Sequence, residues 1–379
     1  MNSLRQKIEE EIRERGPIPF SRYMELCLYD SEFGYYSRNA EQFGKAGDFY
    51  TSSDVHAVFG RLLARQFDEM WRVLGSPERI TLEELGPGRG LFAGDVLDWS
   101  EKKFSGFFRA LSYVLVETSP ALRAQIETTL TRHLETGKAA FLSPEDRLWA
   151  IDIVFANEFF DALPVEIVST QGSLRIDARG GRFVETWAPP SPEELEFLDR
   201  YSVHPEAGER VEVPLIAQQQ MEAIAATLQR GFIVAIDYGY TREEQLAGRH
   251  RGTLKAIRQH SVSANPYEAP GEQDITADVN FTALAAAAEK YGMHTQKLIT
   301  QSQFLMGIGE ANQFADAFEE CRLPQERTKV ALQLKHLVTP AGMGESFHVL
   351  VASKGIEKEK VKMLAGLNFG TTYSRINAD

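Results

Sequence analysis

Short apolar runs alternate along the chain with longer segments in which apolar residues recur at helical spacing. The runs are bounded by Gly, Pro and acidic residues, which is typical of strands buried in a parallel sheet. The expected strands span 80–85, 112–117, 139–142, 150–156, 231–237, 294–299 and 346–352. The expected helices span 55–74, 91–102, 120–134, 215–229 and 281–291. This alternation predicts an α/β fold with a mostly parallel, doubly wound sheet.

Several stretches interrupt the alternation and suggest a domain organisation. Residues 1–75 are expected to form an N-terminal helical segment and a covering flap. β-like runs within 163–213 and an irregular stretch at 240–280 predict an inserted α+β cap, to which part of 303–343 contributes. Residues 356–379 have weak periodicity and are expected to form a loosely packed tail. The expected core comprises 76–162, 214–239 and 281–355.

The most informative stretch connects the first of these strands to the helix that follows it. It reads Glu84-Leu85-Gly86-Pro87-Gly88-Arg89-Gly90. Glycine is needed there because only a residue without Cβ allows such a tight turn and such close approach of a ligand. The pattern fits an S-adenosylmethionine site, whereas a dinucleotide site requires Gly-x-Gly-x-x-Gly and position 91 is Leu. The predicted cofactor-binding residues of this turn are Glu84, Gly86, Pro87 and Gly88.

A second acidic residue, Glu117, ends the next expected strand. At that place a carboxylate can accept both ribose hydroxyls of a nucleoside cofactor, although a lone strand-terminal Glu is usually a solvated strand end. A polar loop at 47–53 contains Asp48 and Thr51 and is predicted to close over the cofactor and exclude water. The alternative for this loop is an ordinary surface connection.

The strand at 150–156 leads into Asn157-Glu158-Phe159-Phe160-Asp161, which should face the transferred methyl group. We predict Asn157, Glu158 and Asp161 as catalytic residues, with Asn157 also near the cofactor. Two carboxylates suit a guanidinium, because it remains charged and they can orient one nitrogen for attack. The alternative is that Glu158 caps a helix and Asp161 makes a structural salt bridge. His260 is a further candidate that could take a proton or orient a substrate, or be structural.

Composition narrows the classes of function. The chain has 379 residues and a net charge of −13, which argues against a protein that wraps nucleic acid. No apolar run is long enough to cross a membrane, and the two cysteines and eight histidines show no metal-ligand spacing. The acidic N-terminal segment lacks the features of a signal peptide or a mitochondrial presequence, so a cytoplasmic location is expected.

Taken in order, these motifs resemble the MidA family. The motifs that carry the resemblance are Pro17-Ile18-Pro19-Phe20, Phe33-Gly34-Tyr35-Tyr36, Gly47-Asp48-Phe49-Tyr50-Thr51-Ser52, the glycine turn, Asn157-Glu158-Phe159-Phe160-Asp161-Ala162-Leu163-Pro164, Asp237-Tyr238-Gly239 and Gly252-Thr253-Leu254. Ser53-Asp54 departs from the Pro-Glu that the family often shows. The resemblance implies a class I methyltransferase fold. In the mitochondrial members it implies symmetric dimethylation of an arginine on a core NADH dehydrogenase subunit, in support of complex I assembly.

The leading hypothesis is therefore an S-adenosylmethionine-dependent protein arginine N-methyltransferase, with a protein substrate and without nucleic acid or membrane insertion. An assembly chaperone that binds the cofactor with weak or no catalysis is an alternative of another class. A small-molecule methyltransferase is a third possibility, and an oxidoreductase is disfavoured by Leu91. The oligomeric state and the identity of the acceptor stay open.

Overall fold

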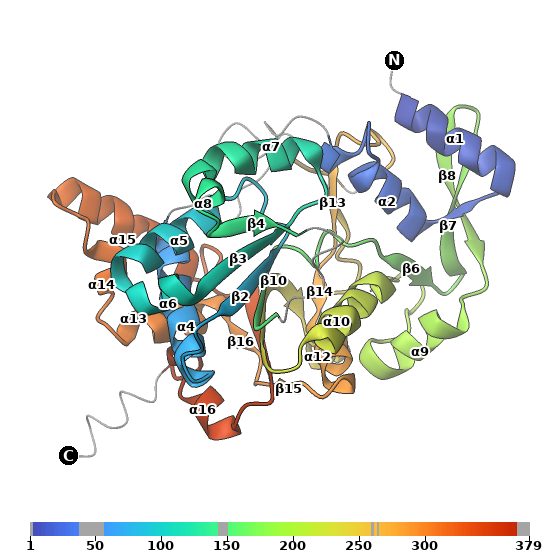
Figure 1. Cartoon of the computed structure of the whole chain (residues 1–379). Coiled ribbons are helices and arrows are strands. Elements are labelled where there is room, and N and C mark those ends of the chain that lie inside the picture. The colour runs from blue at the N-terminus through green and yellow to red at the C-terminus, as the bar shows by residue number, and fades with distance from the viewer. Residues whose placement is uncertain (1–2, 38–56, 143–150, 259–260, 264, 370–379) are drawn as a thin grey trace.

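The computed structural model describes residues 3–37, 57–142, 151–258, 261–263 and 265–369. Its centre is a sheet in the order β15-β17-β10-β5-β2-β3-β4 (Figure 1). The strands are β2 (Ile80–Leu85), β3 (Leu111–Val116), β4 (Ala139–Phe141), β5 (Ile153–Asn157), β10 (Gly231–Tyr240), β15 (His294–Thr295) and β17 (Phe347–Lys354). The five strands from β4 to β10 are parallel, and β17 runs antiparallel to β10. The predicted α/β doubly wound sheet is confirmed.

Helices cover both faces of this sheet because its inner strands are apolar on both faces. On β10, Phe232, Val234 and Ile236 pack with one set of helices, whereas Ile233 and Ala235 pack with the other. The first set is α4 (Val58–Val73), α5 (Leu91–Lys103), α6 (Ser105–Ala110), α7 (Pro120–Thr129), α8 (Thr131–Glu135), α13 (Gln301–Glu310), α14 (Ala315–Phe318) and α15 (Pro324–Val338). The second set is α10 (Leu215–Thr227) and α12 (Phe281–Lys290). The two-residue alternation is what a parallel strand between two helical layers requires.

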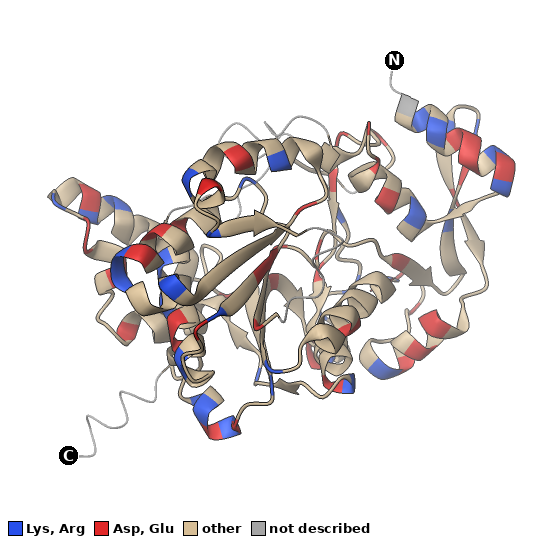
Figure 2. Ribbon diagram, viewed as in Figure 1, with Lys and Arg blue, Asp and Glu red and all other residues tan. Residues whose placement is uncertain are grey.

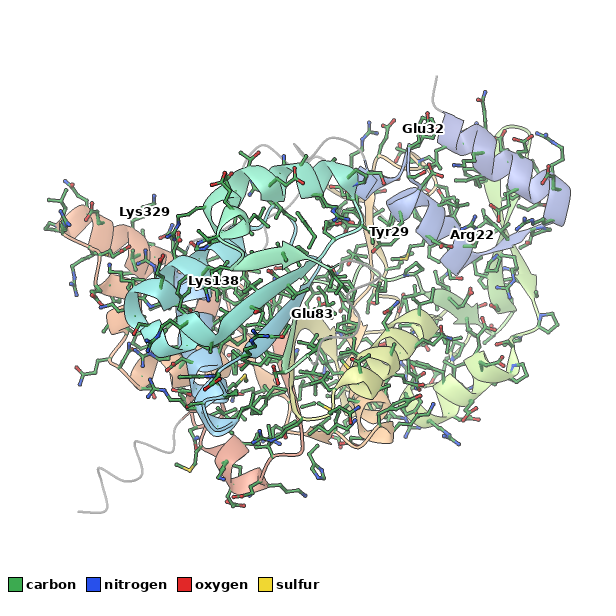
Figure 3. The ribbon with its side chains drawn as sticks, in the orientation of Figure 1. Arg22, Tyr29, Glu32, Glu83, Lys138 and Lys329 are labelled. Carbon is green, nitrogen blue, oxygen red and sulfur yellow. The ribbon has the colours of Figure 1, made fainter. Side chains whose placement is uncertain are left out.

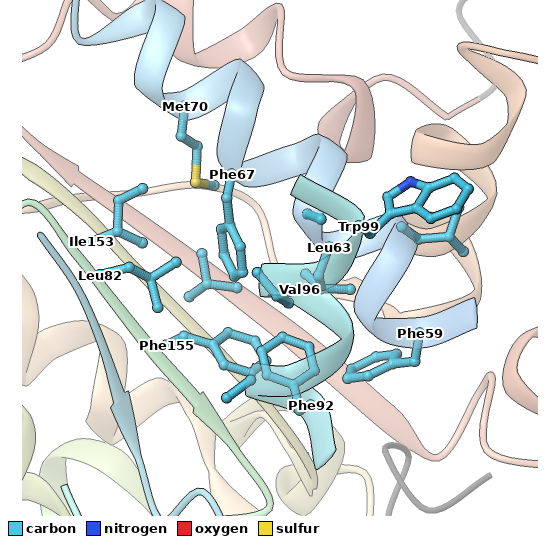
Figure 4. Packing of buried hydrophobic residues seen from close by; sticks show 14 of the residues in the cluster. Phe59, Leu63, Phe67, Met70, Leu82, Phe92, Val96, Trp99, Ile153 and Phe155 are labelled. Atoms are coloured by element: carbon cyan, nitrogen blue, oxygen red, sulfur yellow. The ribbon is translucent and has the colours of Figure 1, made fainter. Parts of the chain in front are cut away.

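Aromatic side chains dominate the first of these layers (Figure 4). Phe92 of α5 stacks on Phe155 of β5 with ring centroids 4.4 Å apart, and Phe67 of α4 meets Phe155 edge-on at 5.6 Å. Burying such rings stabilises the fold by roughly 2–3 kcal/mol each. The packing holds α5, and thereby the turn that precedes it, against the strands that end at the cavity described below.

A second sheet is inserted after β5. It contains β6 (Glu166–Ser169), β7 (Gly172–Arg179), β8 (Arg182–Ala188), β9 (Arg210–Val213) and the N-terminal β1 (Ile18–Pro19). β1 pairs antiparallel with β7, and α1 (Ser3–Arg15) and α2 (Phe20–Tyr29) share an apolar cluster with this sheet. Figure 1 shows α1 and α2 beside β7 and β8, at the opposite end of the molecule from α15. The N-terminal segment up to Tyr29 is therefore packed on the insertion.

The remaining elements are short. A three-stranded sheet is formed by β11 (Lys255–Arg258), β12 (Ser261–Ser263) and β13 (Asp274–Thr276). β14 (Val279–Asn280) pairs with β10, and β16 (Ile299–Thr300) pairs with β17. The others are η1 (Tyr35–Ser37), α9 (Pro192–Tyr201), α11 (Arg242–Leu246), α16 (Lys358–Lys362) and η3 (Ala365–Leu367).

Three elements differ from the sequence prediction. The helix expected at 120–134 is divided at Leu130, whose φ of −107° takes it out of the helical region. The Pro-rich stretch at 189–192, whose composition favours a turn, leads into α9, which was not among the expected helices and which Ser191 and Glu194 begin with reciprocal capping hydrogen bonds. The strand expected at 294–299 is two short pairings with β17, one at His294–Thr295 and one at Ile299–Thr300.

The described part of the segment after β17, residues 355–369, is packed on the core, whereas a loose tail was expected over 356–379. The N–H groups of Ala365 and Gly366 donate to Glu69 Oε2 and Gln66 Oε1 of α4 at 2.9 and 2.8 Å. Val361 and Leu364 are buried in the main core cluster. Periodicity is a poor guide here because the segment is held by side chains of α4 rather than by a long helix of its own.

Charged side chains of both signs are interspersed on the outer helices, and the inner strands carry few (Figure 2). Within the described parts of the chain, no helix combines the length and apolar character needed to cross a bilayer. Acidic residues occur among the Lys and Arg positions of α1, α5 and α16.

Candidate active site

A cavity of about 1460 Å³ lies at the carboxyl ends of the central strands. Its lining comes from the ends of β2, β3, β5 and β10, from α2 and η1, and from β13 of the small sheet. Ligand pockets are typically about 300–1,000 Å³, so this cavity has room for a nucleoside cofactor and part of a second reactant. Its place at the strand ends is the one that doubly wound sheets use for ligands.

The glycine turn forms one wall of the cavity. Gly86, Gly88 and Gly90 have φ values of 62°, 54° and 76°, all in the left-handed region that favours glycine. A Cβ built on Gly86 would lie 3.1 Å from the Phe159 ring. Gly86, Pro87 and Gly88, which the sequence pattern predicts to bind the cofactor, all line the cavity. The backbone of residues 86–90 therefore forms an open cradle, which a side chain at Gly86 would fill.

Glu84 ends β2 beside this cradle. Its side chain is 4% exposed, and the Tyr113 hydroxyl donates to its Oε2 at 2.8 Å. Burial raises the pKa of Glu84 to about 8, more than the Tyr113 hydrogen bond lowers it. A carboxyl group in this position suits a cationic partner, because an adjacent positive charge would stabilise the ionised carboxylate.

Glu84 is expected to make the stability of the cofactor-free protein depend on pH. Its pKa is 4.5 when solvated and about 8 when buried, so the folded state binds the proton more tightly. The free energy of unfolding should fall as pH rises through that window, with a slope approaching about 1.4 kcal/mol per pH unit from this group. Urea denaturation at several pH values measures the slope.

Glu84→Gln should flatten that slope, since the amide does not titrate. Asp161 and Asp237 are also buried carboxyls with raised pKa values, and they contribute equally to both proteins. The informative quantity is therefore the difference between the two pH profiles. Parallel profiles for the wild type and Glu84→Gln would contradict the assignment.

Glu117 follows β3 directly and lines the same cavity. One of its oxygens accepts the N–H of Ser119 at 2.7 Å, and burial raises the pKa of the carboxyl. Ser119 caps α7 through the N–H of Leu122, and its hydroxyl donates to the carbonyl of Tyr36 at 2.6 Å. These bonds hold the loop after β3 against the N-terminal segment.

The predicted acceptor residues lie in a tight turn after β5. Asn157 is the last residue of β5, and its Nδ2 donates to Glu158 Oε1 at 3.0 Å. Glu158 has φ of 50°, an uncommon conformation for a residue with a side chain. Asn157, Glu158 and Asp161 all line the cavity. No helix follows Glu158, so the alternative in which it caps one does not hold.

Asp237 at the end of β10 holds this turn together. Its Oδ2 accepts the backbone N–H groups of Phe159, Phe160 and Asp161 at 3.2, 3.1 and 3.3 Å. Its Oδ1 accepts the N–H of Tyr238 at 3.0 Å. The side chain is 1% exposed, so these bonds are shielded from water. One buried carboxylate therefore ties the strained turn to the neighbouring strand.

Asp161 is 8% exposed and is bound by hydroxyls. Oδ2 accepts from the Tyr238 hydroxyl and from Thr276 Oγ1, the latter at 2.7 Å. Its Oδ1 is buried without a hydrogen-bond partner, and so is Asn157 Oδ1. Burial raises the pKa of Asp161. Unpartnered buried oxygens are costly, so a ligand that brings N–H donors would be stabilised here.

Part of the cavity lining was not predicted from the sequence. Tyr29 donates to the carbonyl of Ala162 at 2.9 Å, and the Tyr36 hydroxyl donates to Asp274 Oδ1 at 2.9 Å. Figure 3 places Tyr29 where α2 approaches the end of the central sheet. Tyr36 and Tyr238 stood within conspicuous motifs, but Tyr29 carried no signal that would have marked it. Nothing in sequence spacing connects these residues to each other.

Three predicted site residues, Asp48, Thr51 and His260, lie outside the described residues. Among the described residues, the histidines that line the cavity are His250, His336 and His348, and His250 Nδ1 is 3.0 Å from Asp278 Oδ2. Among the residues that the structure describes, no cluster of His, Cys, Asp or Glu has the arrangement of a metal site.

A glycine cradle after β2, with the buried Glu84 and the partly buried Glu117 at the ends of β2 and β3, defines a class I methyltransferase on this fold. A family model of S-adenosyl-L-methionine-dependent methyltransferases matches residues 62–299, and the chain belongs to this family. The predicted enzyme class and cofactor, S-adenosyl-L-methionine, are thereby confirmed. The unfilled cradle at Gly86 and the unpartnered oxygen of Asn157 are compatible with that cofactor.

Curated relatives extend the likeness over most of the chain. The mitochondrial protein arginine methyltransferase NDUFAF7 homolog of Drosophila melanogaster is 30% identical, over 93% of this chain and 85% of its own length. The mitochondrial protein arginine methyltransferase NDUFAF7 of Homo sapiens is 28% identical, over 89% of this chain and 80% of its own. The resemblance drawn from the motifs is therefore confirmed.

A solved structure shares the entire fold. It is a methyltransferase-like protein from Burkholderia thailandensis bound to S-adenosyl-homocysteine, with 28% identity and a TM-score of 0.82. The superposition covers 96% of this chain and 94% of that one. A second, native crystal structure of a protein from the same superfamily and organism gives a TM-score of 0.79.

Proposed function

We propose that the glycine turn, Glu84 near the end of β2 and Glu117 after β3 hold the cofactor. Glu84 would pair with its amino group, and Glu117 would accept the ribose hydroxyls. Gly86, Pro87 and Gly88 would contact the methionine part through the backbone. Asp48 and Thr51 belong to the same proposal as the flap that excludes water. When bound, the cofactor supplies an electrophilic methyl group on a sulfonium.

We further propose that the methyl acceptor is an arginine of a protein and that the product is symmetric dimethylarginine. The observation that carries this is the turn of Asn157, Glu158 and Asp161, which places carboxylates and unpartnered oxygens beside the cradle. A guanidinium remains charged in proteins and brings five N–H donors to such oxygens. The names of the curated relatives support the same acceptor.

The residues of the turn have distinct roles in this proposal. Glu158 and Asp161 orient the guanidinium so that one nitrogen points at the methyl carbon. The methyl carbon would pass from the sulfonium to that nitrogen, with the S–C bond broken and S-adenosylhomocysteine released, and one of the carboxylates would accept the proton that the nitrogen loses. Asn157 Oδ1 would receive an N–H of the cofactor or the acceptor. The paired charges contribute to the rate mainly by orienting the acceptor. Holding the reacting atoms close together and aligned removes much of the entropic part of the activation barrier.

Glu158→Gln should abolish most methyl transfer while leaving cofactor affinity unchanged. The amide keeps an oxygen for the bond from Asn157 Nδ2 but cannot hold the guanidinium charge or take its proton. A loss of roughly a hundredfold in kcat is expected. The measurement is transfer of labelled methyl into protein, with the modified residue identified by mass spectrometry. Glu196→Gln on the surface of α9, which breaks an ion pair with Arg200, should have no effect.

The substrate protein is proposed to be a core subunit of a respiratory NADH dehydrogenase, and the enzyme to act in the cytoplasm. Comparing proteins of the source cell with and without this gene, by mass spectrometry of methylated arginines, tests the subunit, and cell fractionation tests the location. An assembly chaperone would be favoured instead if Glu158→Gln lost methyl transfer but complex assembly continued. A small-molecule methyltransferase would be favoured if no protein lost a methyl mark.

A further inference from the structure

Two tyrosine–carboxylate pairs lie close together. They are Tyr238 with Asp161 and Tyr36 with Asp274, and their residues come from parts of the chain that are distant in sequence. Tyr238 and Thr276 bind Asp161 Oδ2, and Tyr36 binds Asp274 Oδ1. Asp274 is 5% exposed and shares β13 with Thr276. All of these side chains line the cavity that the glycine turn also lines. The pairs therefore face the same space as the proposed acceptor turn.

The rings of Tyr29 and Tyr36 lie next to these pairs. Their centroids are 5.5 Å apart, with an interplanar angle of 33°. Tyr29 is fixed by its bond to the carbonyl of Ala162, directly after Asp161. The ring of Tyr238 is already faced by Lys255 Nζ, at 5.3 Å, so Tyr238 contributes its hydroxyl rather than its ring. Lys255 itself is paired with Asp278 at 3.1 Å.

Flat rings next to two fixed carboxylates distinguish between cations by shape. A guanidinium is planar, stacks on aromatic faces and presents its donors as a rigid fork that matches carboxylates. A lysine ammonium is compact and strongly hydrated, and it gains less from a ring or from two separated carboxylates. A urea group has the shape of the guanidinium but no charge.

We propose that Tyr29, Tyr36 and Asp274, together with Asp161, form a specificity pocket that selects a guanidinium over an ammonium or a neutral urea group. Asp161 Oδ1 is the buried acceptor that the guanidinium would satisfy. Tyr36 holds the Asp274 carboxylate in place, so it is a positioning residue for the second contact. The inference rests on the proposed arginine methyltransferase function and adds residues that no motif had connected with the acceptor.

Binding of short blocked peptides tests this without turnover. The probes are acetyl-Gly-Xaa-Gly-amide with arginine, lysine or citrulline at Xaa. Each is titrated by NMR into the full chain saturated with S-adenosylhomocysteine. The arginine peptide should bind at least about tenfold more tightly than either of the others, because lysine lacks the planar fork and citrulline lacks the charge.

Two variants and a matched control locate the selectivity. Tyr36→Phe removes the hydroxyl that holds Asp274, and Asp274→Asn removes the charge; each should reduce the arginine preference by roughly tenfold. Tyr267→Phe is the control, because Tyr267 makes an equivalent bond to Glu185 at 2.9 Å and neither residue lines the cavity. Affinity for S-adenosylhomocysteine, measured by calorimetry, should be the same in all three variants and confirms that each is folded.

Equal binding of the arginine and lysine peptides would overturn the inference, as would unchanged preference in both Tyr36→Phe and Asp274→Asn. Either result could occur while mass spectrometry still finds arginine methylation, in which case the proposed function stands without this pocket. Absence of any arginine mark, with the cofactor bound, would instead refute the proposed function. The two failures are thus distinguishable.

Discussion

Replacing Gly86 with valine should abolish binding of S-adenosylmethionine. Gly86 has φ of 62°, and its hypothetical Cβ already lies 3.1 Å from the Phe159 ring. The two further methyl groups of valine would have to occupy the cradle itself or displace Phe159. A side chain in this backbone region also costs about 1–2 kcal/mol before any contact is counted. Calorimetric titration of the folded variant with the cofactor measures the loss.

Gly137→Val is the matched control for that experiment. Gly137 has φ of 69°, and no atom lies within 4 Å of a Cβ built on it. The Gly137→Val substitution therefore introduces the same backbone strain at a position that does not line the cavity. The control should lose some stability but bind the cofactor normally. Normal binding by a folded Gly86→Val protein would show that this turn does not contact the cofactor.

Asp237→Asn should separate cofactor binding from methyl transfer. The carboxylate accepts four backbone N–H groups through two oxygens, whereas an amide has one oxygen and would turn an NH₂ toward donors. The turn at 158–161 should loosen, and a displacement near 1 Å at a reacting group costs roughly a hundredfold in rate. Cofactor affinity should change little, because Glu84 and the glycine turn are held by other bonds.

Hydrogen exchange gives an independent readout of the same variant. The amides of 159–161 should exchange faster in Asp237→Asn, while those of β2 and β3 should not change. Asp152→Asn is the control: Asp152 Oδ2 also accepts a backbone N–H, from Thr81 at 2.8 Å, but it precedes β5 and does not line the cavity. It should lower stability by about 1–3 kcal/mol without changing methyl transfer. Equal losses of activity in both variants would contradict a specific role for Asp237.

The parts of the site that could be predicted from the sequence are those whose signal is local. Glycines at 86 and 88 follow an acidic strand end, and the next strand end brings Glu117; all of these line the cavity. Capping signals are also local, and Ser191 with Glu194 would have revealed α9 had the Pro-rich stretch not favoured a turn. Local signals work because φ preferences and capping bonds act within a few residues.

Other features of the site could be recognised only in the folded structure. Asp237 was recognised as part of a motif, but its bonds to the turn at 159–161 join two neighbouring parallel strands that are far apart in the chain. The acceptor side was predicted from Asn157, Glu158 and Asp161, with His260 as a further candidate. The hydroxyls that bind Asp161 come from β10 and β13, and no spacing in the sequence connects them.

By itself, the sequence determined the alternation of strands and helices, the glycine turn after β2 and the acidic turn after β5. Each depends on runs of apolar residues or on single residues that favour one backbone conformation. Only the tertiary structure decided which groups share the cavity and how strongly each carboxyl is buried. Tyr29, Tyr36 and Asp274 lie near one another because α2 and β13 pack beside the central sheet. That packing is driven by the burial of apolar surface throughout the molecule. The pKa of Glu84 rises for the same reason, since burial belongs to the fold and not to the residue.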